Sequence, residues 1–145
     1  MSRYISPDVR REVAARAEFL CEYCLIAEED TFFGCEVEHI ISRKHGGSSE
    51  LSNLAYACAF CNRYKGSDVG SVSEAGEFSR FFNPRSDRWS EHFRLNANVI
   101  HPLSVIGDVT ARIFRFNHPE QLLERAGLIS VGRYPNGAAL TRMNG

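Results

Sequence analysis

Two pairs of cysteines constrain the fold of this chain more than any other feature. Cys21 and Cys24 form one C-x-x-C pair, and Cys58 and Cys61 form a second. Two knuckles of this spacing can place four thiolates tetrahedrally around one zinc ion at about 2.3 Å, with no position left for a substrate. We therefore predict a structural zinc site. The alternatives are buried thiols or a redox-active pair, but the latter needs a βαβ context that the sequence lacks. The fifth cysteine, Cys35, is expected to be a small buried hydrophobic residue.

The composition is typical of one globular domain. The chain has 145 residues, of which 43% are hydrophobic and 24% charged, close to the average for soluble domains. No stretch approaches the roughly 20 apolar residues that cross a bilayer, and no apolar signal segment stands at the N-terminus. We expect a cytoplasmic protein with reduced cysteines, a single domain over residues 1–145, and no membrane partner.

The charge of the chain is unevenly distributed. The formal net charge of −1 excludes a strong uniform basic field of the kind that marks many nucleic-acid-binding proteins. Residues 1–37 carry eight acids against four bases. Residues 39–66 instead carry four bases and one acid: Arg43, Lys44, Arg63, Lys65 and Glu50. Positive charge therefore gathers around the second cysteine pair.

Helix and strand signals surround the cysteines. Ser6-Pro7-Asp8 is typical of a helix start, because Ser can cap free N–H groups and Pro fits the first turn. Apolar spacing then predicts a helix over about residues 7–20. Short β-rich runs at 37–41 and 54–57 are followed by a helix at 59–65 that ends at Gly66. The predicted order is strand, loop, strand, helix.

The second half of the chain is expected to extend this core. Residues 67–76 are rich in Ser and Gly and are typical of a linker. A strand pair and two helices are then expected at residues 92–103, 106–116 and 117–126. The last fifteen or so residues are expected to be irregular or frayed. We predict an α+β fold with an N-terminal helix, a core over about 7–66, and a C-terminal extension of a strand pair plus helices over about 77–127.

Four further polar residues stand between and just after the cysteine pairs: Glu38, His39, Asn53 and Asn62. Their setting resembles the HNH endonuclease family, whose motif runs acid-His, then Asn, then His or Asn after a C-x-x-C. In this chain the pattern is Val37-Glu38-His39-Ile40-Ile41, Gly46-Gly47, Asn53-Leu54 and Cys58-Ala59-Phe60-Cys61-Asn62. The resemblance spans about residues 10–66. Residues 82–93 are similar to a tail that many bacterial members carry.

The resemblance implies a ββα-metal (His-Me finger) fold and the hydrolysis of phosphodiesters. His39 is implied to be the general base for water, since imidazole titrates near neutrality. Glu38 and Asn62 are implied to hold one catalytic Mg²⁺ or Mn²⁺ through oxygen atoms. Asn53 is implied to fix His39 through hydrogen bonds to the loop backbone. The chain departs from the common pattern twice, with Glu rather than Asp before the His, and with Asn62 where the family name has His.

Glu38 and His39 are adjacent, so they would face opposite ways on a regular strand. We therefore expect the strand to end or twist at His39. If His39 were itself a metal ligand, another base would be required, and His45 is the nearby candidate. Otherwise His45 is expected to be a surface loop residue.

Four basic residues are expected to contact phosphates without reading bases: Arg43, Lys44, Arg63 and Lys65. Lys65 is favoured because it follows Asn62 by one helical turn. The alternative for each is a solvated surface residue. Trp89 is expected to anchor the core rather than to stack on bases.

The leading hypothesis is a zinc-stabilised, Mg²⁺- or Mn²⁺-dependent endonuclease that acts on double-stranded DNA. One alternative is a non-catalytic zinc-bound module that binds nucleic acid or protein. Another is an RNA-directed toxin nuclease. An acid placed beside a phosphate favours the enzyme, since a pure binding module has no use for it. The sequence leaves a homodimer open.

Overall fold

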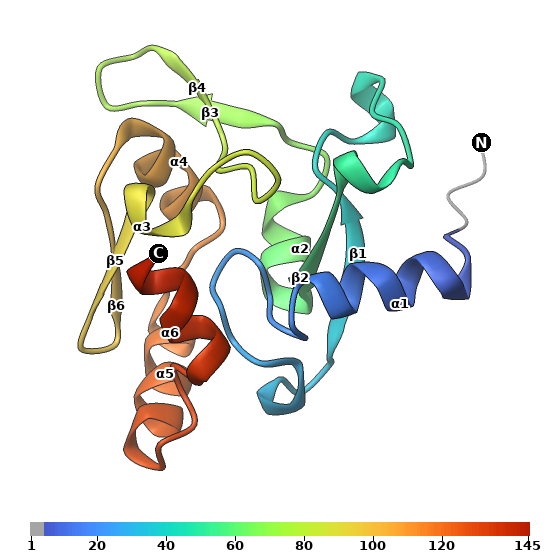
Figure 1. Cartoon of the computed structure of the whole chain (residues 1–145). Coiled ribbons are helices and arrows are strands. Elements are labelled where there is room, and N and C mark those ends of the chain that lie inside the picture. The colour runs from blue at the N-terminus through green and yellow to red at the C-terminus, as the bar shows by residue number, and fades with distance from the viewer. Residues whose placement is uncertain (1–4) are drawn as a thin grey trace.

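The first half of the chain forms a helix, a strand pair and a second helix. A computed structural model describes residues 5–145 (Figure 1). Helix α1 (Pro7–Arg16) is followed by strand β1 (Cys35–His39), strand β2 (Leu54–Cys58) and helix α2 (Ala59–Lys65). The strands are antiparallel, with Cys35 opposite Cys58 and His39 opposite Leu54. The predicted order of strand, strand and helix is confirmed, and so is the mixed α+β class.

Helix α1 begins as the sequence predicts and ends earlier. The Ser6 side chain accepts a hydrogen bond from the backbone N–H of Val9 at 3.2 Å, and Pro follows in the first turn. The helix ends at Arg16 because Glu18 and Phe19 adopt left-handed backbone angles, with φ of 56° and 57°. This turn redirects the chain into the first cysteine knuckle.

The two faces of the β1/β2 hairpin are covered by different helices. Leu54, Tyr56 and Val37 pack with residues of α1, whereas the alternate residues Ala55 and Ala57 belong to the main core. Because side chains alternate along a strand, the helix α2 side of β1 receives Glu36 and Glu38. Within residues 5–145, β1 pairs with β2 alone, so its other edge is open. This open edge positions the candidate site.

The segment expected to be a linker contains a small hairpin instead. Strands β3 (Gly70–Val72) and β4 (Phe78–Arg80) pair antiparallel. The turn between them is closed by a hydrogen bond from Ser73 N–H to the Glu77 carbonyl at 2.8 Å, and Gly76 takes the left-handed conformation, with φ of 85°. The Ser- and Gly-rich composition thus belongs to a turn and its flanks.

The C-terminal extension contains the predicted strand pair and the two predicted helices, together with two helices that were not predicted, over residues 89–92 and 137–144. Its elements are α3 (Trp89–His92), β5 (Phe93–Asn96), β6 (Val99–Pro102), α4 (Val105–Ile113), α5 (Pro119–Ser130) and α6 (Gly137–Asn144). The expectation of a frayed tail was wrong. Helix α6 is capped by Asn136, whose side chain accepts from the N–H of Ala139 at 2.8 Å, and α6 packs against α3.

An aromatic core joins the extension to the first cysteine knuckle. Trp89 is buried and donates its indole N–H to the Tyr23 carbonyl at 2.8 Å. The Tyr23 ring packs on Phe114 with centroids 4.9 Å apart. The expected core position of Trp89 is confirmed. None of the helices in residues 5–145 has the length and apolar character that crossing a membrane requires.

Candidate functional site

The four paired cysteines come together as predicted. The sulfur atoms of Cys21, Cys24, Cys58 and Cys61 all lie within 4.8 Å of one another, and all four side chains are buried. The Cys24 and Cys58 sulfurs are 3.8 Å apart. A tetrahedron with Zn–S bonds of about 2.3 Å has S–S edges of about 3.8 Å. The group therefore fits a structural zinc ion, which would join the first knuckle to the start of α2.

The four thiols are not equivalent in their hydrogen bonds and in the ease with which they lose a proton. Burial raises the pKa of Cys21, but hydrogen bonds from the other three thiols outweigh this effect and hold the pKa well below its ordinary value. The Cys58 sulfur also accepts from the N–H of Cys61 at 3.4 Å, at the N-terminus of α2. The contacts around Cys21 favour its thiolate, which is the form that binds zinc, whereas hydrogen bonds with neighbouring thiols and burial raise the pKa of Cys24 and Cys61.

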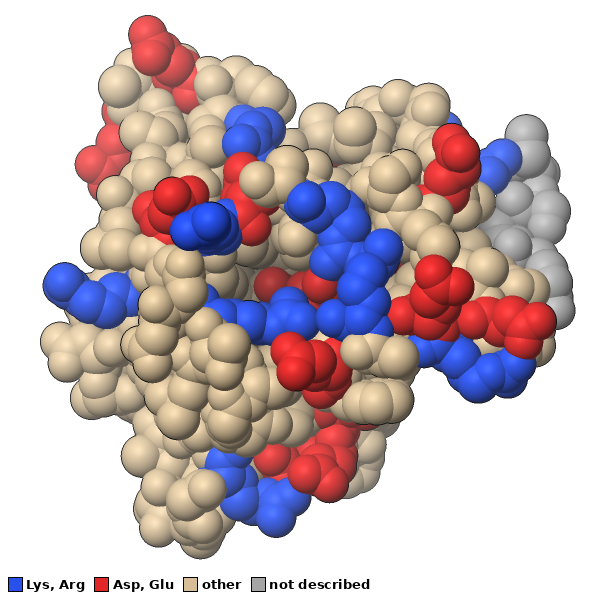
Figure 2. Space-filling view, in the orientation of Figure 1, with Lys and Arg blue, Asp and Glu red and all other residues tan. Residues whose placement is uncertain are grey.

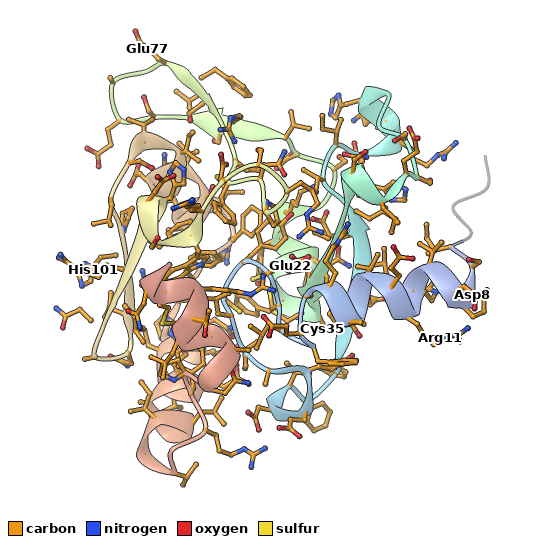
Figure 3. All side chains as sticks on the ribbon, in the orientation of Figure 1. Asp8, Arg11, Glu22, Cys35, Glu77 and His101 are labelled. Carbon is orange, nitrogen blue, oxygen red and sulfur yellow. The ribbon has the colours of Figure 1, made fainter. Side chains whose placement is uncertain are left out.

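Cys35 stands apart from the four ligands. It is the first residue of β1, is half-buried and packs against both apolar clusters of the fold, and Figure 3 labels it. Burial raises the pKa of its thiol. Its surroundings are those of a hydrophobic core residue, as expected from the sequence.

Glu38, His39 and Asn62 line one hollow of about 340 Å³ at the open edge of β1. Strand β1 ends at His39, as the adjacency of Glu38 and His39 led us to expect. Because β1 is an edge strand, the hollow reaches both of its faces. Arg10 of α1 lines it from one side and Gly66, after α2, from the other. Arg10 was not among the residues predicted from the sequence.

The Glu38 carboxylate is held by two partners. Its Oε1 accepts a hydrogen bond from the Tyr23 hydroxyl, and its Oε2 lies 3.1 Å from the Lys65 ammonium. The side chain is 5% exposed. Burial raises the pKa of Glu38 to about 7, although Lys65 and the Tyr23 hydrogen bond both lower it. The carboxylate is thus fixed at the boundary between the core and the hollow.

The expectation that Lys65 contacts phosphate was wrong, because Lys65 is only 2% exposed. Its ammonium donates to the His39 carbonyl at 2.9 Å in addition to pairing with Glu38. The reason is the position of Lys65 on the inward face of α2. Lys65 follows the buried Cys61 by four residues, so both side chains lie on the same face of the helix and point inward. The lysine neutralises a buried acid instead of reaching solvent.

Replacing Lys65 by methionine is expected to lower the free energy of unfolding by about 1–3 kcal/mol, because the buried Glu38 carboxyl loses its cation and must protonate near neutral pH, and the His39 carbonyl loses its donor. Urea denaturation of the zinc-loaded protein measures this loss. Lys44→Met is the matched control, since Lys44 is exposed and its replacement is expected to change stability by less than about 0.5 kcal/mol. Equal stability of the two variants would contradict the assignment.

The loop after β1 is tied to Asn53. The Asn53 Oδ1 accepts from the N–H of Ile41 at 2.9 Å, and its Nδ2 donates to the carbonyls of Ile41 at 2.9 Å and Ser48 at 2.7 Å. These are contacts of the kind that the resemblance implied. At the other end of the loop, the His39 Nε2 lies 2.9 Å from the Ser49 hydroxyl. Asn53 and Ser49 together set the path of the loop beside His39.

Two glycines permit this path. Gly46 has φ of 85°, a left-handed conformation that glycine adopts without strain. Gly47 passes so close to the start of the loop that a Cβ there would lie 1.7 Å from the Ile41 carbonyl oxygen. The Gly46-Gly47 pair therefore allows the loop to fold back onto the Asn53 side chain.

Asn62 lies on α2 and faces the acidic side of β1. Its Nδ2 is 3.5 Å from the Glu36 carboxylate, and the side chain is half-buried at the hollow. Glu36 and Glu38 are two residues apart on the strand and share this face. A second carboxylate, which the sequence did not single out, therefore lies next to Asn62 outside the hollow.

The remaining predicted basic residues lie nearer the surface. Lys44 and Arg63 are exposed, and Arg43 is half-buried. Arg43 donates to the Ser49 hydroxyl at 3.2 Å, so it is linked to His39 through Ser49. His45 is exposed, as expected for a loop residue.

A different group of arginines surrounds Glu22. On the face shown in Figure 2, basic side chains gather around a central hollow with acidic atoms inside it, and Figure 3 places Glu22 at the centre of the molecule. Glu22 is 2% exposed and pairs with Arg85 and with Arg142 at 3.6 Å. Arg85 and Arg16 also donate to the Leu54 carbonyl, at 3.2 and 2.7 Å. These arginines tie α1, α6 and the loop before α3 to β2.

Comparison with known proteins places the site within a recognised segment. Residues 21–68 match the family described as HNH endonuclease. No curated protein and no solved structure matches the chain significantly. The matched segment begins at the first cysteine of the zinc group and ends just beyond α2. It thus includes all four cysteines and the residues Glu38, His39, Asn53 and Asn62. The chain is thus similar to the HNH endonuclease family over residues 21–68, a segment that covers the zinc group and most of the residues that line the hollow.

Proposed function

We propose that this protein is an endonuclease that hydrolyses phosphodiester bonds in DNA, using His39 as general base and one Mg²⁺ or Mn²⁺ held by Glu38 and Asn62. The observation that carries the proposal is the shared hollow. Glu38, His39 and Asn62 come from the strand end and from α2, yet they line one recess at the open edge of β1, inside the matched HNH segment.

Each residue has a chemical task in this proposal. The His39 imidazole accepts a proton from the water that attacks phosphorus. Ser49, bonded to its Nε2, and Asn53, which ties down the loop, keep the ring in place. Glu38 and Asn62 offer carboxylate and amide oxygens, the donors that Mg²⁺ prefers. The cation would neutralise charge on the scissile phosphate and on the leaving 3′-oxygen.

The surface near the hollow supports a nucleic-acid substrate. Lys44 and Arg63 are exposed, and Arg43 stands beside the His39 loop. Such residues contact backbone phosphates and carry little sequence information, so we propose double-stranded DNA cut with little sequence choice. Lys65, which pairs with Glu38, is not part of this surface.

The proposal is tested by nicking of supercoiled plasmid with zinc-loaded protein, with Mg²⁺ or Mn²⁺ and without either. Asn62→Ala is expected to lower the rate by about 100-fold, since it removes a donor for the cation that stabilises the transition state. Asn96→Ala, an exposed position on β5, is the control and should leave the rate unchanged.

Three other results would count against the proposal. Nicking that needs no divalent cation would contradict the proposed role of a catalytic cation. Cleavage of RNA with no cleavage of plasmid would favour the RNA-directed alternative. Clean DNA binding without nicking under any cation would favour the non-catalytic module.

A further inference from the structure

Tyr23 lies between two zinc cysteines and reaches the candidate cation site. It is the second residue after Cys21 and directly precedes Cys24, and its side chain is 1% exposed. Its hydroxyl donates to the Oε1 of Glu38. Within the described residues 5–145, this acid supplies the hydrogen bond that satisfies the hydroxyl in the core. The contact joins the zinc knuckle to β1.

The Tyr23 side chain has little freedom to move. Its ring packs against Phe114 with centroids 4.9 Å apart and against the edge of Phe82 at 6.4 Å. Its backbone carbonyl accepts from the Trp89 indole at 2.8 Å. Because packed aromatic rings hold one orientation, the Tyr23 hydroxyl has a fixed position relative to Glu38.

Both oxygens of Glu38 are therefore anchored through residues that adjoin the zinc ligands. Tyr23 precedes Cys24 and holds Oε1. Lys65 follows Cys61 by one helical turn and holds Oε2 at 3.1 Å. Two residues that lie close to zinc cysteines in the sequence thus hold the Glu38 carboxylate at the hollow.

We propose that Tyr23 is a positioning residue, which orients the Glu38 carboxylate for a divalent cation and couples the cation site to the zinc site. The inference rests on the cation site of the proposed function. A residue that holds a metal ligand without touching the metal typically changes metal affinity by about 10–100-fold when replaced. Without the Tyr23 hydroxyl, Lys65 alone would hold the carboxylate, so part of its orientation would have to be fixed each time a cation binds.

Tyr23→Phe tests the inference because it keeps the ring and removes the hydroxyl. Mn²⁺ alone is the probe, and its dissociation constant is measured by electron paramagnetic resonance on zinc-loaded protein. We expect Mn²⁺ to bind about 10–100-fold more weakly with unchanged zinc content. The nicking rate should fall at low Mn²⁺ and recover at saturating Mn²⁺, because the hydroxyl does not touch the reacting atoms.

Tyr56→Phe is the matched control. The Tyr56 hydroxyl also donates to a glutamate, with distances of 2.8 and 2.7 Å to the two Glu28 oxygens. It lies on the same hairpin but faces α1, so its loss should leave Mn²⁺ affinity unchanged. A purely structural effect of losing a tyrosine hydroxyl would appear in both variants.

The outcomes separate the inference from the proposed function. Equal Mn²⁺ affinity in Tyr23→Phe and wild type, or an equal loss in Tyr56→Phe, would overturn the inference alone. Wild-type protein that binds no Mn²⁺ would overturn both. Wild-type protein that binds Mn²⁺ in a Tyr23-dependent way without nicking DNA would support the inference and overturn the nuclease proposal.

Discussion

Replacing His39 by alanine is expected to lower the rate of plasmid nicking by about 10²–10⁴-fold, the usual contribution of a general base. The protein should keep its zinc and its melting temperature. His39 is half-buried at the end of β1, and its Nε2 bonds to a loop hydroxyl at 2.9 Å. The ring therefore contributes little to the core.

His45→Ala is the control for this prediction, because His45 is exposed in the same loop and should be dispensable. A His39→Ala protein that keeps more than a tenth of the wild-type rate would contradict the role of His39. If the His45→Ala variant were the inactive one, His45 would be the base instead, which is the alternative that the sequence left open.

Removal of zinc is expected to abolish the cooperative fold, and Cys58→Ser should have the same effect. A structural zinc site contributes about 10–16 kcal/mol of apparent binding free energy, whereas a whole domain is stable by only about 5–15 kcal/mol. Cys58 is also the joint between β2 and α2, and its sulfur accepts from the N–H of Cys61. Zinc content and thermal melting are the measurements.

Cys35→Ala is the matched control for the zinc prediction. Cys35 is half-buried at the start of β1 and lies outside the four-sulfur group, so this variant should retain zinc and melt cooperatively. A Cys58→Ser protein that still binds zinc and melts normally would contradict the structural role of the four-sulfur site.

Local patterns predicted the centre of the molecule well. The C-x-x-C spacing identified the zinc group, the runs around β1 and β2 identified the hairpin, and Gly66 marked the end of α2. These features depend on neighbouring residues, so the sequence contains the information. The β-rich run at 37–41 alone did not locate the end of β1 at His39, which followed from the premise that the adjacent Glu38 and His39 serve one site.

The features that the sequence did not predict depend on distant contacts. Strand β3 is short, and the Val72 carbonyl accepts from Arg112 of α4 at 2.9 Å. Helix α6 is held by packing on α3 and by the approach of Arg142 to Glu22. Neither contact leaves a local pattern in the sequence of its segment.

The side chains that support the site were the hardest to predict. Lys65 was taken for a surface cation although its i, i+4 spacing from Cys61 already indicated an inward direction. The only sequence signal for Tyr23 is its position inside a C-x-x-C pair. Its hydrogen bond to Glu38 depends on how the first cysteine knuckle packs on the hairpin. The contacts of Lys65 and Tyr23 with Glu38 can be identified only in the three-dimensional structure.

The most direct test of the account is the anomalous diffraction of zinc-loaded crystals soaked in Mn²⁺. We predict one manganese peak at the edge of β1, with ligands from the Glu38 carboxylate and the Asn62 side-chain oxygen and with His39 beside it, separate from a zinc peak at the four sulfurs. Crystals that show the zinc peak but no manganese between Glu38 and Asn62 would contradict the account.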